Sequence, residues 1–226
     1  MTTPLSRAEA FCERFGIAVP ILLAPMAGAC PPALAAAVAN AGGMGSAGAL
    51  LMSPDDIAAW MREFRAGSNG AVQLNLWIPD APPERNPAHE AAVREFLGGW
   101  GPPVPPSAGD APLKDFDAQC EALLAAGPRA VSSIMGLYPP DFVSRLKARG
   151  IAWFAVATTV AEAVAAEAAG ADVVVAQGSE SGGHRGAFDA AEAERRAVGL
   201  FSLLPAVADA VRIPVVATGG IADGRG

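Results

Sequence analysis

Short apolar segments alternate with alanine-rich helical stretches along nearly all of this chain. The apolar segments are unbroken runs, which is typical of strands that are buried on both faces of a parallel sheet. Repeated strand–helix units predict either a doubly wound sheet or a (β/α)8 barrel, and near-regular strand spacing favours the TIM barrel. The seven expected strands are 21–24, 43–47, 71–76, 130–134, 152–157, 172–176 and 215–218.

The helical stretches carry start and stop signals. Ser53 followed by Pro54 is a typical helix start, and Gly150 and Gly170 follow the ends of two other stretches. The segment 78–112 breaks the rhythm, because it is rich in proline and holds only a short helical piece at 88–97. We expect it to be a long loop insertion on the active-site face, since it leaves the carboxyl end of a barrel strand. The main helices are expected at 31–41, 53–65, 115–125, 140–148, 160–169 and 198–211.

The length of 226 residues fits one domain, 1–226. A complete barrel needs an eighth strand and typically about 250 residues. The sequence stops just after the seventh expected strand, so we expect an incomplete, C-terminally truncated barrel with open edges.

Composition excludes several function classes. The chain has 16 Lys and Arg against 23 Asp and Glu, a net charge of −7, which argues against a nucleic-acid partner. A hydrophobic fraction of 52% with 17% charged residues excludes intrinsic disorder. No run of 18 apolar residues is free of polar breaks, so no membrane partner is expected.

The cysteines and the N-terminus indicate the compartment. Cys12, Cys30 and Cys120 show neither ligand spacing for a metal nor a disulfide framework, so we expect no metal site and a reducing environment. The N-terminus lacks the apolar core of a signal peptide. A cytoplasmic location is therefore expected.

The densest group of functional residue types is AQGSESGGHRG at 176–186, directly after the sixth expected strand. Gly182 and Gly183 let the backbone pass close to a flat ligand. His184 follows them and can act as acid or base near neutral pH. The alternative is a glycine-rich turn with a surface histidine.

Three further motifs also follow expected strands, and each has a structural alternative. Gly219 and Gly220 in ATGGIADG (217–224) offer backbone N–H groups to a phosphate, or form an ordinary turn. Pro25 and Met26 in LAPMAG (23–28) form an apolar wall for a ring, or pack in the core. Asn75 in QLNLW (73–77) hydrogen-bonds a ligand amide, or makes a turn.

Five motifs occur in the order found in one known family. They are LAPMAG at 23–28, AGGMGSAGALLMSP at 41–54, QLNLW at 73–77, QGSESGGHRG at 177–186 and TGGIADGRG at 218–226. With these motifs the chain resembles the nitronate monooxygenase family, known earlier as 2-nitropropane dioxygenase, whose members are FMN-dependent TIM barrels. The resemblance runs from about Phe15 to the last residue.

The resemblance implies a site and a reaction. His184 matches the catalytic histidine, which takes the α-proton of a nitroalkane or holds an anionic nitronate. The implied reaction is the oxidative denitrification of alkyl nitronates, such as propionate 3-nitronate, with O2. The expected oligomeric state is a monomer or a homodimer. The residues expected to bind FMN are Pro25, Met26, Ala27, Asn75, Gln177, Gly182, Gly183, Gly219 and Gly220.

Two alternatives stay open. The related flavin-dependent enoyl-ACP reductases use NAD(P)H and carry a similar GGH motif, but generally have Glu where this chain has Gln177. The second alternative is a non-catalytic truncated barrel with weak FMN binding, because the family continues into an eighth strand that completes the phosphate site. Ser181 replaces the family's commoner Ala, which is a small change.

Overall fold

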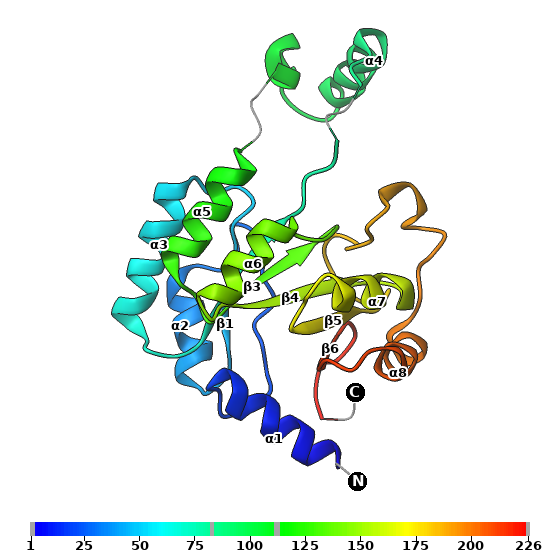
Figure 1. Cartoon of the computed structure of the whole chain (residues 1–226). Coiled ribbons are helices and arrows are strands. Elements are labelled where there is room, and N and C mark those ends of the chain that lie inside the picture. Colours follow the sequence, from blue (N-terminus) through cyan, green and yellow to red (C-terminus); the bar gives the residue numbers. More distant parts are fainter. Residues whose placement is uncertain (1–2, 82–83, 111–113, 225–226) are drawn as a thin grey trace.

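The computed structural model describes residues 3–81, 84–110 and 114–224, in which six parallel strands form one curled sheet. The strand order follows the sequence, and every neighbouring pair is parallel. Helices cover the convex side of the sheet (Figure 1), because parallel strands need crossover connections that are right-handed. The expected incomplete TIM barrel is thus confirmed as a curled half-barrel. The strands are β1 (Gly45–Gly48), β2 (Val72–Trp77), β3 (Ala130–Ile134), β4 (Ala152–Ala157), β5 (Val173–Gln177) and β6 (Val215–Thr218).

The helices match the expected stretches closely, with one addition at the N-terminus. They are α1 (Pro4–Phe15), α2 (Pro32–Asn40), α3 (Pro54–Gly67), α4 (Pro87–Gly98), α5 (Phe116–Ala126), α6 (Pro140–Ala148), α7 (Val160–Ala168) and α8 (Leu200–Ala210), with 3-10 turns η1 (Pro106–Asp110) and η2 (Ala190–Glu192). Among the described residues, no helix combines the length and apolarity needed to cross a bilayer.

The segment 21–24 is not a strand, so the expectation of seven strands is wrong at this point. Leu22 forms a single isolated parallel bridge with Met44. Pro25 has no N–H to continue the ladder. The chain then crosses the end of β1 at Gly48, where a Cβ would lie 2.8 Å from the backbone nitrogen of Ala27. The chain therefore leaves the sheet edge after one bridge.

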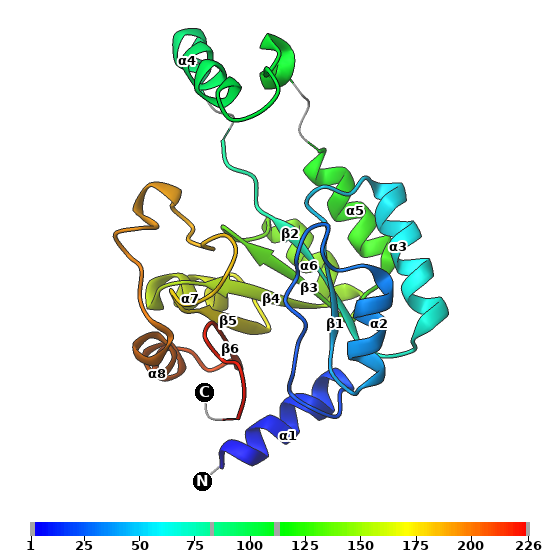
Figure 2. The ribbon, with the colours of Figure 1, turned by 180° about the vertical axis from the view of Figure 1, so that it is seen from behind.

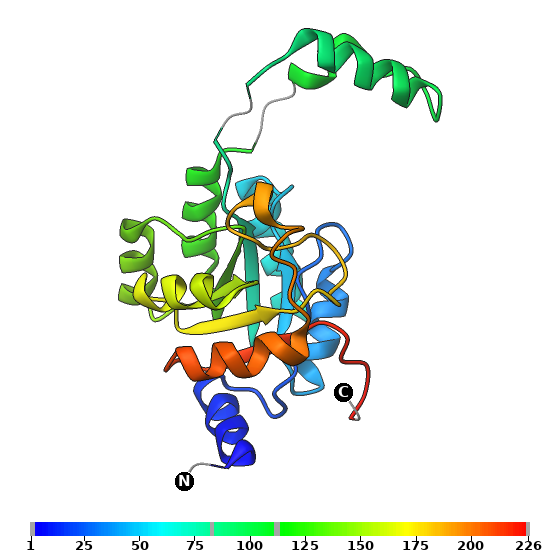
Figure 3. The same ribbon diagram turned by 90° about the vertical axis from the view of Figure 1, so that its right-hand side faces the viewer.

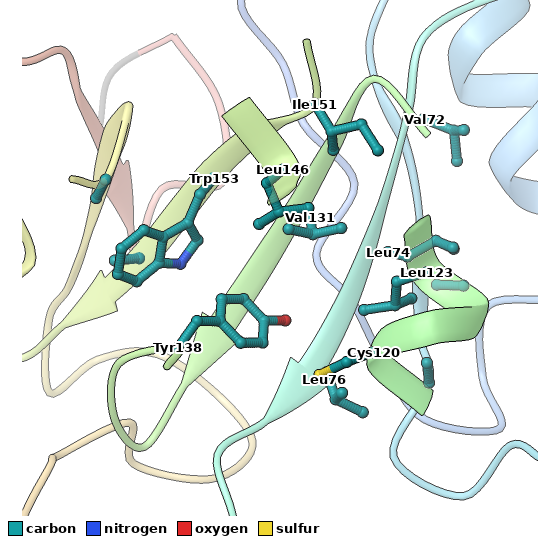
Figure 4. Packing of buried hydrophobic residues seen from close by; sticks show 14 of the residues in the cluster. Val72, Leu74, Leu76, Cys120, Leu123, Val131, Tyr138, Leu146, Ile151 and Trp153 are labelled. Carbon is teal, nitrogen blue, oxygen red and sulfur yellow. The ribbon is translucent and has the colours of Figure 1, made fainter. Parts of the chain in front are cut away.

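The outer face of the sheet forms the main core (Figure 4). Leu74, Leu76 and Val131 pack with the covering helices. The Trp153 indole N–H donates to the Ser133 hydroxyl at 3.0 Å, which satisfies a polar group inside this layer.

The helix α1 closes the amino end of the inner face and was not anticipated from the sequence. The Phe15 ring lies 4.7 Å from the Phe11 ring and 4.9 Å, edge-on, from the Phe154 ring. The helix begins where the Thr3 side chain accepts from the Ser6 N–H, and it ends at Gly16 with a φ of 69°. In Figures 1 and 2, α1 lies at the end of the sheet opposite to α4.

The insertion contains regular structure. Its described central part, residues 84–110, is here called the arm and holds α4 and η1, whereas 82–83 and 111–112 lie outside the described residues. Arg85 ties the arm together, since it binds Glu90 and Asp110 and donates to the Gly109 carbonyl at 3.1 Å. Figure 3 shows the arm standing away from the sheet.

Shortening Phe15 tests the closure of the inner face by α1. We expect Phe15→Ala to lower the free energy of unfolding by about 3–5 kcal/mol, because a buried aromatic ring is lost. Leu5→Ala, an exposed change on the same helix, should lower it by less than about 0.5 kcal/mol. Urea denaturation of both variants measures the difference, and equal losses would contradict this role of α1.

Candidate active site

The carboxyl ends of the strands gather the motifs singled out in the sequence. Gly48, Trp77, Gln177 and Thr218 end β1, β2, β5 and β6, and parallel strands bring these ends to one edge. The loop after β5 and the turn after β6 lie at this edge, together with segment 23–28 across β1. In a strand–helix barrel this is the catalytic face.

His184 lies on the loop after β5 and reaches back to β2. Its ring contacts the Trp77 ring edge-on, with centroids 4.7 Å apart and planes at 67°. The imidazole is otherwise exposed, so it can exchange protons with a ligand in the mouth. The structure thus brings together two motifs that lie far apart in the sequence.

Gln177 fixes the backbone of this loop with both ends of its amide. Its Nε2 donates to the His184 carbonyl at 3.0 Å, and its Oε1 accepts from the Gly186 N–H at 2.7 Å. A Cβ at Gly186 would lie 2.9 Å from both Ile134 and Val156, so only glycine fits there. Gln177 therefore positions His184, and its expected contact with flavin stays a prediction.

Asn75 is buried on the inner face beside β3. Its amide nitrogen donates to the Ser132 carbonyl at 3.3 Å and to the Ser132 hydroxyl at 3.1 Å. Both amide hydrogens are thereby used, so its carbonyl oxygen is the group left to accept from a ligand N–H.

The two glycine pairs play different structural roles. Gly219 and Gly220 have φ of 122° and 70°, which side chains rarely adopt. A Cβ at Gly219 would lie 2.7 Å from the Ser181 hydroxyl. Gly183 also has a positive φ, of 78°, but no described atom lies within 4 Å of a Cβ built at Gly182 or Gly183, so a flat ligand can approach the backbone there.

Ser181 contributes more than the sequence indicated. Its hydroxyl donates to the Thr218 carbonyl at 3.0 Å, and the Gly178 N–H donates to the same carbonyl at 3.0 Å. An alanine at this position could not make the first bond. Ser181 therefore joins the loop after β5 to the turn after β6.

Pro25, Met26 and Ala27 cross the end of β1 beside Gly48. Pro25 is half-buried, whereas Met26 and Ala27 are exposed at the mouth. An exposed methionine here is available for contact with a ring. The structure therefore places this motif with the other expected site residues.

Two glutamates that the sequence analysis did not single out anchor the loop. The Glu162 carboxylate accepts from the Thr158 N–H at 2.7 Å and from the Phe188 N–H at 2.9 Å. The Glu180 carboxylate accepts from the Leu200 N–H at 2.8 and 3.0 Å at the start of α8. The Leu200 N–H holds the pKa of Glu180 below its ordinary value. A Thr-x-x-Glu capping signal at Thr159 could have indicated Glu162.

Backbone strain also marks this edge. Within the described part of the chain, Met135 is the only non-glycine residue with a positive φ, at 65°. It directly follows β3, where the Ile78 N–H donates to the Ile134 carbonyl at 3.1 Å. Strained residues of this kind cluster at active sites.

The residues present fit FMN. The open glycine pair suits a flat ring, and the backbone N–H groups of the turn at Gly219 and Gly220 suit a phosphate. Buried donors also lack partners among the described residues, namely Nε and Nη2 of Arg185 and the Ser46 hydroxyl. Unpaired buried donors of this kind require an explanation, and a bound ligand would supply one. No group of three or more potential metal ligands occurs among residues 3–81, 84–110 and 114–224.

Fold and site together match one part of a TIM barrel, with a histidine and glycine loops at the carboxyl ends of its strands. Over residues 9–226 the chain matches the family model for nitronate monooxygenase. The chain therefore belongs to the nitronate monooxygenase family, a family of oxidoreductases.

Individual relatives agree with this assignment. The nitronate monooxygenase of Paraburkholderia phytofirmans is 40% identical over 228 residues, covering 96% of this chain and 61% of the relative. That of Pseudomonas aeruginosa is also 40% identical, covering 96% and 63%. The chain thus spans 61–63% of the length of these two curated relatives.

Two solved structures can be compared with the chain in the same way. A nitroalkane oxidase from Streptomyces ansochromogenes has a TM-score of 0.81 at 35% identity, covering 94% of this chain and 61% of that one. FabK from Thermotoga maritima has a TM-score of 0.69 at 30% identity, covering 96% and 55%. The chain is therefore more similar to the nitroalkane oxidase than to this FabK.

Two substitutions of Gln177 separate its two hydrogen bonds. Gln177→Glu keeps the acceptor for the Gly186 N–H but loses the donor to the His184 carbonyl, which should destabilise the protein by about 1–3 kcal/mol. Gln177→Leu loses both bonds and should be less stable still. Hydrogen exchange should show the Gly186 amide protected in Gln177→Glu and unprotected in Gln177→Leu. Equal protection of this amide in the two variants would contradict the role of the Gln177 side chain in holding the loop.

The lowered pKa of Glu180 predicts that the stability of the protein depends on pH. Because its folded-state pKa lies below its ordinary value of 4.5, it contributes stability above that value and loses it as pH falls through the folded pKa. Glu180→Gln should therefore lower the Tm at pH 7, and the difference from the natural protein should vanish in acid. Thermal melts of both proteins from pH 7 into acid measure this difference in Tm. A difference that stays constant with pH would contradict a role for the charged Glu180 carboxylate at the start of α8.

Proposed function

We propose that this chain carries the FMN-binding and proton-transferring part of a nitronate monooxygenase that oxidises alkyl nitronates with O2. The observation that carries the proposal is the placement of His184, held against Trp77 and clamped through its carbonyl by Gln177 beside two open glycines. Membership of the family supports it.

We assign the cofactor contacts as follows. Met26 and Ala27 would line the ring together with Pro25, and the carbonyl oxygen of Asn75 would accept from a flavin N–H. Gln177 would also contact the flavin, Gly182 and Gly183 would allow close approach of the backbone, and Gly219 with Gly220 would bind the phosphate. FMN, when bound, supplies the one-electron oxidation of the nitronate and the reaction with O2.

The chain's own residues handle the proton. A neutral imidazole of His184 takes the α-proton of a nitroalkane, which breaks the C–H bond and leaves the negative charge on the nitro oxygens. The resulting imidazolium then holds the anionic nitronate by charge-assisted hydrogen bonding. The Trp77 ring limits rotation of the imidazole and shields one side of it from water.

An NAD(P)H-dependent enoyl-ACP reductase is the second candidate, supported by the likeness to FabK. Its lower TM-scores and the Gln177 side chain favour the first candidate. Oxidation of NAD(P)H with an enoyl thioester, without turnover of nitronate, would select the reductase. We further infer a cytoplasmic location, which the three free, buried cysteines support.

The key test compares the two histidines of the chain. His184→Ala should lower turnover of a neutral nitroalkane by about 10²–10⁴-fold, because the base is lost. It should lower turnover of preformed propionate 3-nitronate by much less, because this substrate needs no deprotonation and loses only the charge-assisted contact. His89→Ala, on the arm, serves as the matched control and should leave both rates unchanged.

Retention of FMN on gel filtration is measured for the same proteins. If the natural chain retains FMN and His184→Ala still turns over the neutral nitroalkane at the full rate, the base assignment is wrong. If the natural chain loses FMN and has no activity, the alternative of a non-catalytic truncated barrel is correct for this chain.

A further inference from the structure

One charged side chain at the catalytic edge has buried donors without a partner. Arg185 directly follows His184 on the loop after β5 and is half-buried. Its Nε and Nη2 atoms are buried and make no hydrogen bond. Among residues 3–81, 84–110 and 114–224, no other charged side chain has buried nitrogen or oxygen atoms in this condition. Such an edge is unfavourable, because the guanidinium has lost water on that side and has gained no acceptor in exchange.

The two unpaired atoms form the side of the guanidinium that can bind two oxygens at once. Their N–H bonds lie in one plane and match the two oxygens of a carboxylate or a phosphate. Arg85 uses the same edge in this chain, since its Nε and Nη2 donate to the two carboxylate oxygens of Glu90. Arginine has five N–H donors and no acceptor, so only an acceptor can satisfy this edge. The free edge of Arg185 therefore has the chemistry of an oxyanion site.

Gln177 fixes the backbone on both sides of Arg185. Its Nε2 donates to the carbonyl of the preceding residue, His184, at 3.0 Å, and its Oε1 accepts from the N–H of the following residue, Gly186, at 2.7 Å. The base of the arginine side chain is thus held in place, whereas its terminal bonds can still rotate toward a ligand. Room for a ligand exists beside this segment, because a Cβ at Gly183 would meet no described atom within 4 Å.

Glu180 lies near Arg185 but does not pair with it. The Glu180 carboxylate accepts from the Leu200 N–H at 2.8 and 3.0 Å, and the Nε and Nη2 atoms of Arg185 stay unbonded. The Leu200 N–H and, to a lesser degree, the charge of Arg185 hold the pKa of Glu180 below its ordinary value. Glu180 also borders the turn after β6, since a Cβ at Gly220 would lie 3.2 Å from the Glu180 Cβ. Arg185 therefore lies on the side of the loop that faces this turn.

We infer that the Nε–Nη2 edge of Arg185 is a binding site for an oxyanion, a phosphate or a carboxylate, carried by a ligand at the mouth of the half-barrel. The choice of ligand rests on the proposed function, which offers two sources of such a group. One is the phosphate of FMN, and the other is the carboxylate of a substrate such as propionate 3-nitronate. The position of Arg185 beside the turn after β6 favours the phosphate of FMN.

Thermal unfolding with simple anions tests the site without flavin and without turnover. Inorganic phosphate or acetate, compared with chloride at equal ionic strength, should raise the Tm of the natural chain more than that of Arg185→Met. The general effect of these salts on stability acts on both proteins, so the difference between them reports the site. Arg195→Met is the matched control, because the Arg195 side chain lies on the same loop but is 81% exposed, and it should respond like the natural chain.

The stability of the ligand-free variant separates this role from a structural one. Arg185→Met should not lower the Tm in chloride alone, because it removes a charge whose buried edge has no partner. An arginine that holds the loop together would show the opposite result. Circular dichroism checks that both arginine variants are folded.

FMN and riboflavin, which lacks the phosphate, distinguish the two sources. If the phosphate is bound, fluorescence titration should show that Arg185→Met weakens FMN binding by about 10–100-fold and leaves riboflavin binding unchanged. If the substrate carboxylate is bound, both flavins should bind as they do to the natural chain. In that case the KM for propionate 3-nitronate should rise by about the same factor in Arg185→Met, whereas the KM for propyl-1-nitronate should stay the same.

Equal responses of the natural chain and Arg185→Met to phosphate and to acetate overturn the proposal. A lower Tm of ligand-free Arg185→Met with unchanged anion responses also overturns it, because Arg185 is then a structural residue. Failure of the proposed function is distinguishable from these results. In that case the natural chain turns over no nitronate, while the anion response of its Tm still depends on Arg185.

Discussion

The inner face of the curled sheet is the surface on which the rest of the structure depends. Helices cover the outer face, but in the described part of the chain no helix lies inside the half-barrel, so the inner face is covered by other means. At the amino ends of the strands, the rings of α1 pack against Phe154. At the carboxyl ends, Gly186 presses against Ile134 and Val156. The loop that presents His184 is therefore also part of the cover of the core, and the stability of the fold and the position of His184 depend on the same contacts.

Much of the fold could be predicted because the strand–helix rhythm follows from burial alone. The strands β2 to β5 lie where apolar runs occur, since both faces of each strand are largely covered, whereas β6 at the edge of the sheet is only half-buried. The segment 21–24 has the same composition but pairs only at Leu22, because Pro25 and the crossing at Gly48 end the ladder. The helix α1 escaped prediction although its signals are present, namely Thr3 before Pro4, apolar Phe11 and Phe15, and Gly16 at the end.

The site was predictable in its location but not in its hydrogen bonds. Residue type and topology placed His184 and the glycine pairs at the carboxyl ends of the strands, and the structure brings them together there. The partners of Gln177 are backbone atoms of residues 184 and 186, which no side-chain pattern reveals. The Ser181 hydroxyl likewise bonds a backbone atom, the Thr218 carbonyl. The sequence alone therefore did not reveal that Ser, in place of the family's commoner Ala, connects two loops.

Trp77 connects parts of the molecule that lie far apart in the sequence. It ends β2, its ring contacts the imidazole of His184, and the insertion that carries the arm begins at the next residue, Ile78. The Ile78 N–H donates to the Ile134 carbonyl, and Gly136 lies so close to Ile78 that a Cβ there would be 3.0 Å away. The root of the insertion is therefore fixed to β3 at the point where Gly186 also packs. His184, the cover of the inner face and the arm thus share the ends of β2 and β3 as their support, so the position of His184 depends on three segments that are distant in the chain.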